Sequence, residues 1–189
     1  MIDKRVVAPM TIPVLALRGL TVFPQLMLHF DVGRAASIQA LEEAMGEKRE
    51  IFLVTQRDLT VENPDQDDLY AIGTVAEVKQ ILRLPENSVR VMVEGYCRGR
   101  LLRLVDTEPY ITAEVEYLEE PIPTKGNSPR TEAAIRQIYS QMERYTELSD
   151  RVTPEIYLKL LASDDPGYIA DYAAQNLPLR FEDKQSVLE

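Results

Sequence analysis

Short hydrophobic runs with the period of β-strands dominate the first two thirds of the chain. In residues 88–94, valine occupies every second position, which is typical of a strand with one buried face. The turn residues Pro85, Glu86 and Asn87 precede this run and predict a hairpin with residues 72–84. We predict about six or seven short strands. The predicted strands span 12–17, 26–32, 51–55, 72–84, 88–94, 101–105 and 111–118.

One helix interrupts these strands early in the chain. Ile38, Leu41 and Met45 are spaced by three and four residues, so they fall on one face of a helix over residues 35–45 that Gly46 ends. Mostly antiparallel strands with one inserted helix predict a small β-barrel, closed or half-closed. The fold class is therefore α+β.

The hydrophobic pattern changes from strand-like to helical near residue 118. The join, residues 119–127, holds two prolines and one glycine, which interrupt both strand pairing and helix continuity. We therefore predict a β-barrel domain over residues 1–118, a linker over 119–127 and a helical domain over 128–189.

Three predicted helices of the second domain begin in the same way. A side chain that can accept a hydrogen bond stands before proline at Ser128, Thr153 and Asp165, which is the pattern of an N-cap followed by the first helical position. A fourth helix is predicted to begin near Phe181 and to continue to Glu189. Helices this short must pack on one another, so we predict a bundle. Because the last helix has no cap, we expect this domain to be truncated at its C-terminal end.

The charge of the chain argues against polyanionic partners. There are 31 acidic and 21 basic residues, a net charge of −10, so the molecule as a whole repels phosphate backbones and anionic lipids. A series of arginines between residues 83 and 103 is a candidate anion-binding patch. Glu86 and Glu94 interrupt it, and solvated strand faces explain it more simply. We expect neither nucleic acid nor a membrane as a partner.

No catalytic, cofactor-binding or metal-binding residue is predicted. The chain has no Gly-Lys dipeptide and hence no P-loop, and it lacks the HExxH and GxSxG motifs. The segment Gly95–Gly99 shares only the glycine spacing of a nucleophile elbow, and its Cys97 would need His29, the single histidine, as a base. One cysteine and one histidine are too few for an internal disulfide or a zinc site.

Nothing in the sequence predicts membrane insertion or secretion. No apolar run reaches the roughly 20 residues of a membrane span, and the first ten residues lack the hydrophobic region of a signal peptide. A single cysteine fits a reducing compartment. We expect a cytoplasmic protein.

Several segments, in this order, resemble the amino-terminal domain of Lon-type ATP-dependent proteases. The similarity covers nearly the whole chain from about Ile12 onward. The segments are IPVLALRGLTVFP at 12–24, DVGR at 31–34, SIQALEEAM at 37–45, DLYAIGTVA at 68–76, LRLP at 82–85, VRVMVEG at 89–95, DDPGYIAD at 164–171 and LPLRFEDKQSVLE at 177–189.

The resemblance implies a PUA-like β-barrel followed by a helical bundle. It also implies membership in a homohexameric AAA+ protease that degrades damaged and regulatory proteins in the bacterial cytoplasm. The motor, which uses ATP and magnesium, and the Ser–Lys peptidase of that family would lie beyond Glu189. The chain itself would then be non-catalytic, and it would capture unfolded or degron-bearing protein substrates and assist hexamer assembly.

Two groups of residues are candidates for polypeptide or subunit contacts. Leu20, Val22 and Phe23, with Pro24, form a hydrophobic cluster where a connecting loop would ordinarily be polar. The alternative is that these side chains tuck under the barrel. Gln39 and Met45 could face a partner from the early helix, although a stripe at helical spacing is more often core.

A second class of function stays open at this point. A stand-alone PUA-like module that binds a small ligand or RNA has the same strand pattern. The net charge and the helical second domain favour the protease module. The sequence does not define the degron, the surface that contacts substrate, the oligomeric state of this chain alone or the extent of the full-length protein.

Overall fold

The computed structural model describes residues 8–46, 49–118, 128–149 and 152–189. The chain divides into two compact units, residues 1–119 and 120–189, and each is described by itself. The predicted linker over 119–127 lies outside the described residues.

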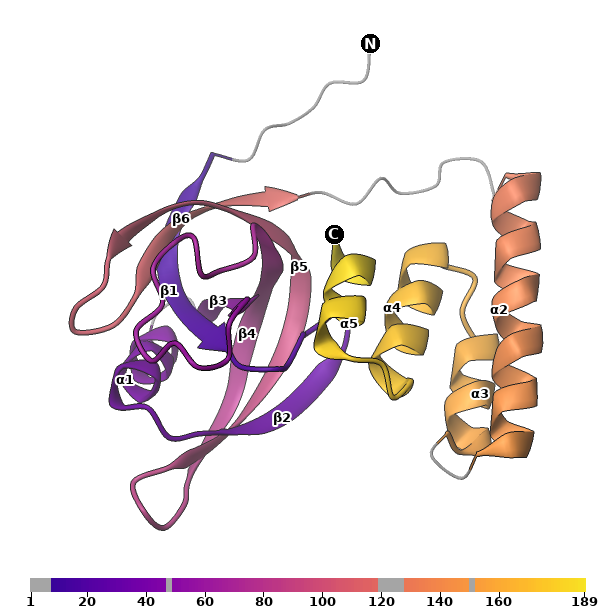
Figure 1. Cartoon of the computed structure of the whole chain (residues 1–189), viewed down its shortest axis with the longest axis horizontal. Helices are drawn as coiled ribbons and strands as arrows, with labels where there is room; N and C mark the ends of the chain where they lie inside the picture. The colour runs from indigo at the N-terminus through magenta and orange to yellow at the C-terminus, as the bar shows by residue number, and fades with distance from the viewer. Residues whose placement is uncertain (1–7, 47–48, 119–127, 150–151) are drawn as a thin grey trace. The chain divides into compact units, whose positions relative to one another are not determined.

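The N-terminal unit contains six strands and one helix in the part that the structure describes (Figure 1). The early helix and most predicted strands are confirmed within a few residues. In chain order the elements are β1 (Met10–Leu17), β2 (Met27–Val32), α1 (Ala35–Ala44), β3 (Glu50–Thr55), β4 (Ile72–Arg83), β5 (Val89–Asp106) and β6 (Thr112–Leu118).

The six strands form one mixed sheet in the order β2-β5-β4-β3-β1-β6. Because β5 also pairs with β6, five strands form a closed circuit, β5-β4-β3-β1-β6 and back to β5, which we call the strand ring. Pairing of β1 with β3 is parallel, and the other described pairings are antiparallel. β2 lies outside the strand ring and pairs with β5 alone among the described strands.

The prediction of separate strands at 88–94 and 101–105 is wrong, because β5 runs unbroken for 18 residues through Gly95 and Gly99. Both glycines are positions of close packing inside the strand. A Cβ on Gly95 would collide with the backbone of Phe23, and one on Gly99 would lie 2.9 Å from the Phe52 ring. Register shifts along β5 allow so long a strand to bend and to pair with β2, β4 and β6.

Two hydrophobic clusters fill the two sides of the sheet. Ile51 and Leu53 of β3 belong to the cluster beneath α1, whereas Phe52 and Val54 belong to the other. β3 is therefore buried on both faces, which explains why its sequence is a continuous apolar run. α1 packs beside β1 and β3 and buries Leu41, together with two alanines, against the first cluster.

The C-terminal unit consists of four helices in its described part: α2 (Pro129–Leu148), α3 (Pro154–Leu161), α4 (Pro166–Asn176) and α5 (Phe181–Leu188). α2 contacts α3 and α4, and α4 contacts α5. Each helix contributes a buried hydrophobic side chain: Met142, Leu160, Ile169 and Leu188. Each helix thus buries a narrow apolar stripe against its neighbours, as its spacing predicts.

The predicted N-caps are confirmed at two of the three helix starts. Ser128 Oγ accepts a hydrogen bond from Thr131 N at 3.1 Å, and Asp165 Oδ1 accepts one from Gly167 N at 2.9 Å. Thr153 has the extended backbone of an N-cap, but its side chain makes no capping bond. At the start of α3 the Ile156 amide instead donates to the backbone carbonyl of Thr153 at 3.0 Å.

The difference in capping between Asp165 and Thr153 predicts a difference in stability when each is replaced. Asp165→Ala is expected to lower the free energy of unfolding of the C-terminal unit by about 1 kcal/mol, because it removes an acceptor from the first turn of α4. Thr153→Ala removes no capping bond and should change that free energy by less than about 0.5 kcal/mol. Urea denaturation followed by circular dichroism measures both. Equal effects of the two substitutions would show that the Asp165 bond does not stabilise α4.

Candidate functional site

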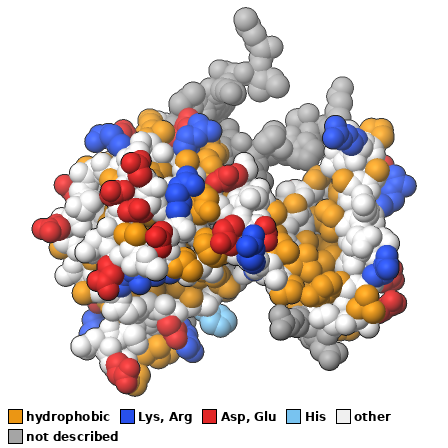
Figure 2. Space-filling model, in the orientation of Figure 1, with side chains coloured by type: hydrophobic (Ala, Val, Ile, Leu, Met, Phe, Trp, Pro, Cys, Tyr) orange, Lys and Arg blue, Asp and Glu red, His pale blue; other side chains and the backbone are white. Residues whose placement is uncertain are grey.

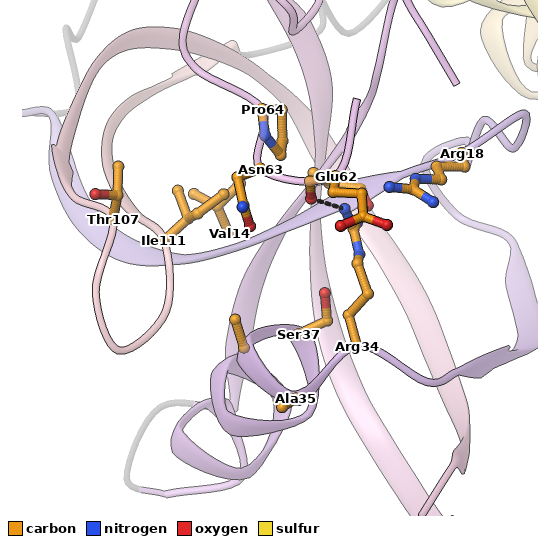
Figure 3. A pocket seen from close by; sticks show the side chains of 12 residues that line it. Val14, Arg18, Arg34, Ala35, Ser37, Glu62, Asn63, Pro64, Thr107 and Ile111 are labelled. Carbon is orange, nitrogen blue, oxygen red and sulfur yellow. Dashed lines mark hydrogen bonds between the residues drawn. The ribbon is translucent and has the colours of Figure 1, made fainter. Parts of the chain in front are cut away.

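The surface of the N-terminal unit is hollowed in three places around the start of α1. The first hollow, about 400 Å³, lies between β1, the first turn of α1, residues 62–64 and the β5–β6 turn (Figure 3). The second, about 360 Å³, lies between the ends of β1 and β2, and the third, about 450 Å³, lies between α1 and the β4–β5 turn. Residues 33–37 contribute to the walls of all three.

Arg34 holds the start of α1 in place beside the first hollow. It stands at the N-cap of α1, and its Nη1 donates to Gln56 Oε1 and to the carbonyl of Glu62, both at 3.1 Å. Its Nη2 donates to the carbonyl of Ala16 in β1. Figure 3 shows the side chain rising from the start of α1 to β1, between the labelled residues of the first hollow. Arg34 therefore ties α1 to β1 and to the segment that follows β3.

A second guanidinium lies beside it. Arg18 is exposed, lines the first two hollows and donates to the carbonyl of Val61 at 2.7 Å. Among the described residues, no ion pair joins Arg18 or Arg34 to a carboxylate, although the exposed Glu62 lines the same hollow. Partial burial, and then the charge of Arg18, lowers the pKa of Arg34. The site therefore carries positive charge that neutral oxygens hold in place.

The structure places three of the predicted contact residues of the loop cluster, Val22, Phe23 and Pro24, in the interior. Phe23 has no exposed surface, Val22 is 3% exposed, and Pro24 is buried. Thr74 Oγ1 donates to the carbonyl of Val22 at 2.6 Å. This burial favours the alternative that these three side chains tuck under the strands.

The remaining candidates lie nearer the surface. Leu20 is partly buried, packs against the first cluster and lines the second hollow. Gln39 is exposed and lines the third hollow, where Glu42 and Arg83 form an ion pair at 3.0 Å. Met45 is partly buried against the first cluster and belongs to none of the three lining sets. Their role in binding stays a prediction.

The arginine series between residues 83 and 103 is largely neutralised by carboxylates. Arg83 pairs with Glu42, and Arg90 pairs with Asp31 at 2.6 Å. Arg100 pairs with Glu116, and Arg103 pairs with Glu114. The hydrogen bond from Arg90 lowers the pKa of Asp31 below its ordinary value.

Neither Cys97 nor His29 lies in a catalytic arrangement. Cys97 lies within β5 opposite Val75, whereas a nucleophile elbow needs a turn between a strand and a helix. His29 is exposed on β2 opposite Met92. Over the described residues, no group of His, Cys, Asp and Glu side chains could hold a metal ion.

The C-terminal unit has a hydrophobic groove of its own. It measures about 410 Å³ and lies between α2 and α4. Hydrophobic side chains gather on this unit in Figure 2, whereas charges of both signs are interspersed over the visible face of the N-terminal unit. The groove is lined by Ala134, Gln137, Ile138, Gln141, Met142, Tyr145, Ala173 and Leu177.

Sequence reasoning missed the residues that define the first hollow. Arg18, Arg34, Glu62 and Asn63 come from segments far apart in the chain, and only the fold brings them together. A local signal does exist at two of them. Arg18 precedes Gly19 just after β1, and Arg34 follows Gly33 just after β2. An arginine next to a glycine in the loop after a strand is well placed to meet a ligand.

Comparison with known proteins decides the family. The sequence profile of the "ATP-dependent protease La (LON) substrate-binding domain" matches residues 11–189. The chain belongs to this Lon substrate-binding domain family. It is 46% identical over 179 residues to the Lon protease of Desulforamulus reducens, covering 95% of this chain and 22% of that protein. It is 40% identical over 178 residues to the Lon protease of Escherichia coli K12, covering 94% of this chain and 22% of that protein.

Solved structures of Lon N-terminal domains share the fold. The N-terminal domain of the Mycobacterium avium complex Lon protease superposes with a TM-score of 0.74 at 14% identity, over 95% of this chain and 90% of that one. A Lon N-terminal domain protein from Xanthomonas campestris gives 0.51 at 15% identity, over 83% and 92% of the two chains. The resemblance to this family inferred from the sequence is confirmed.

The chain spans about a fifth of the length of these Lon relatives, 22% in both cases. Among the described helices, none is both long enough and apolar enough to cross a membrane.

Proposed function

We propose that this chain captures unfolded or degron-bearing polypeptides for an ATP-dependent Lon serine endopeptidase. The observation that carries the proposal is the match to a Lon substrate-binding domain over residues 11–189. The hollows around the start of α1 and the groove between α2 and α4 supply concave surfaces that combine apolar and polar groups, the composition of a binding site.

The finer parts of the proposal concern the whole protein. The strand ring supports a PUA-like β-barrel, and the packing of α2 to α5 supports a helical bundle. In our proposal the full-length protein is a bacterial cytoplasmic homohexamer whose ATP- and magnesium-dependent motor and peptidase lie outside this chain. Six copies around a hexamer would combine weak contacts into useful avidity.

Charge supports a protein substrate over RNA. The ion pairs that arginines of the β4–β5–β6 region form with carboxylates leave little uncompensated positive charge there, and the net charge of the chain is −10. A nucleic-acid site normally presents several unpaired cations along one face.

A binding comparison tests the proposal. Fluorescence anisotropy would follow the 189-residue chain with a labelled, permanently unfolded protein, with its folded counterpart and with single-stranded RNA. We expect a dissociation constant in the micromolar range for the unfolded form and at least about tenfold weaker binding of the folded form. Selective RNA binding would instead support the alternative PUA-like module.

A second measurement tests whether a single chain binds too weakly to be detected without the avidity of a hexamer. The chain fused to a hexameric scaffold raises the local concentration of binding sites without adding a contact. If neither the single chain nor the fused hexamer binds unfolded protein, the capture role is wrong.

A further inference from the structure

The first hollow combines an apolar wall with two guanidinium groups. Val14 and Ile111 lie on the apolar side, and Arg18 and Arg34 bring positive charge to the other side (Figure 3). Ala16 lies beside Arg34, which donates to its carbonyl. This arrangement suits a ligand that carries an anionic group next to a hydrophobic one. At about 400 Å³, the hollow accommodates the end of a peptide but not a folded partner.

The backbone of β1 is open along this hollow. β6 pairs with β1 only from Met10 to Pro13, and Val14 N then donates to the carbonyl of Ile111 at 2.8 Å. The N–H and C=O of a strand residue point to the same side, so those of Ala16 face the same edge as those of Val14. The Ala16 carbonyl on this edge accepts from Arg34 rather than from a strand.

The positive charge here lacks an anionic partner among the described residues. Arg34 donates to one amide and two carbonyl oxygens, and Arg18 donates to a carbonyl. These neutral acceptors satisfy the hydrogen-bonding geometry of the two guanidinium groups but do not compensate their charge. Partial burial, followed by the charge of Arg18, lowers the pKa of Arg34. A carboxylate that entered the hollow would make charge-assisted hydrogen bonds, which are stronger than neutral ones.

We propose that this hollow binds the free C-terminal carboxylate of a polypeptide whose last side chain is hydrophobic. The carboxylate lies at the guanidinium of Arg18, and the last side chain packs against Ile111, the partly exposed residue of the apolar wall, behind which Val14 and Ala16 are buried. Arg34 positions α1 and adds positive charge. This inference rests on the proposed function, since it names a part of the polypeptide that the chain captures.

The charges favour a chain end over an acidic stretch. With a net charge of −10, the molecule repels a segment that carries several carboxylates, and Glu62 at the rim adds to this repulsion. A hydrophobic C-terminus brings a single negative charge. Four separate segments of the chain line the hollow. A peptide end passes between them once, whereas an internal peptide segment would have to both enter and leave the hollow.

The test uses two peptides of the same unstructured ten-residue sequence ending in leucine, one with a free carboxylate and one with a C-terminal amide. Titration of the isotope-labelled 189-residue chain by NMR measures both affinities. We expect the amide to bind at least fivefold more weakly, and the shifted signals of the acid complex to include Ala16, Arg18 and Ser37. A third peptide, with an internal glutamate and a C-terminal amide, distinguishes side-chain from terminal carboxylates.

Substitutions locate the effect. Arg18→Gln is expected to weaken the acid peptide at least fivefold and to leave the amide unchanged, so that the difference between them disappears. Glu62→Gln is expected to tighten the acid peptide by twofold or more. Arg144→Gln removes an exposed arginine of α2, outside the N-terminal unit, and serves as the matched charge control. Arg34 is left intact because its three bonds hold α1 in place.

Each outcome separates this inference from the proposed function. If unfolded protein binds but acid and amide peptides bind equally, or the internal-glutamate peptide binds best, the C-terminus proposal is overturned and the capture role stands. If acid-selective peptide binding depends on Arg18 while no unfolded protein binds even to the fused hexamer, only the capture role is overturned.

Discussion

Replacing Phe23 by alanine is expected to lower the free energy of unfolding of the N-terminal unit by about 3–5 kcal/mol. Phe23 has no exposed surface, so its removal leaves a cavity among residues whose backbone is pinned to the strands. The Val22 carbonyl accepts from Thr74, and Gln25 N donates to the carbonyl of Gly95 at 2.9 Å, which limits collapse into the space. Such a loss is a large fraction of the roughly 5–15 kcal/mol that holds a domain folded.

Urea denaturation followed by circular dichroism measures this effect, with Met27→Ala as the matched control. Met27 is a large hydrophobic residue a few positions away, but it is 57% exposed, so its substitution should cost less than about 0.5 kcal/mol. A Phe23→Ala protein with unchanged stability and weakened binding of unfolded protein would show that Phe23 is a contact residue after all.

Gly95→Ala is expected to prevent folding of the N-terminal unit or to cost more than about 3 kcal/mol. The added Cβ would collide with the carbonyl of Phe23 and would lie 3.0 Å from Pro24 Cα. Both obstacles are backbone atoms, and both neighbouring hydrogen bonds to Gly95 would have to break for them to move. No change of rotamer relieves such a contact.

Gly33→Ala is the matched glycine control. A Cβ at Gly33 meets nothing within 4 Å, and its backbone is not in the left-handed region. Its substitution should change the midpoint of thermal unfolding by a degree or two at most, as expected for a surface site. If calorimetry gives similar midpoints for the two variants, the close packing of β5 on the 23–24 segment does not limit stability.

The sequence predicts local structure well where one physical signal dominates. Alternating valines identify the start of β5, and the acceptor–proline pairs identify three helix starts. The unbroken length of β5 was missed because Gly95 and Gly99 are typical strand breakers, and only their tertiary neighbours explain them. Thr153 likewise matches the local pattern of a cap, although its hydroxyl makes no capping bond.

The candidate site was much less predictable, for a physical reason. A hydrophobic loop sequence has the same composition whether its side chains face solvent or core, so Phe23 could not be distinguished from a contact residue. Arg18 and Arg34 lie 16 positions apart in the sequence. Their proximity depends on the path of β2 and on the packing of α1, which no local pattern encodes.

Because β5 pairs with β2, β4 and β6, different parts of the N-terminal unit differ in how readily they open to solvent. Residues 89–94 of β5 lie between β2 and β4, and residues 98–100 lie between β4 and β6, so amide hydrogens there exchange only when a neighbouring strand separates, and their protection approaches that of global unfolding. The first turn of α1 depends on one packed face and on the bonds of Arg34, so it can open at a lower cost. Residues 33–37, which contribute to all three hollows, therefore form a wall that can shift to fit varied ligands while the sheet stays intact.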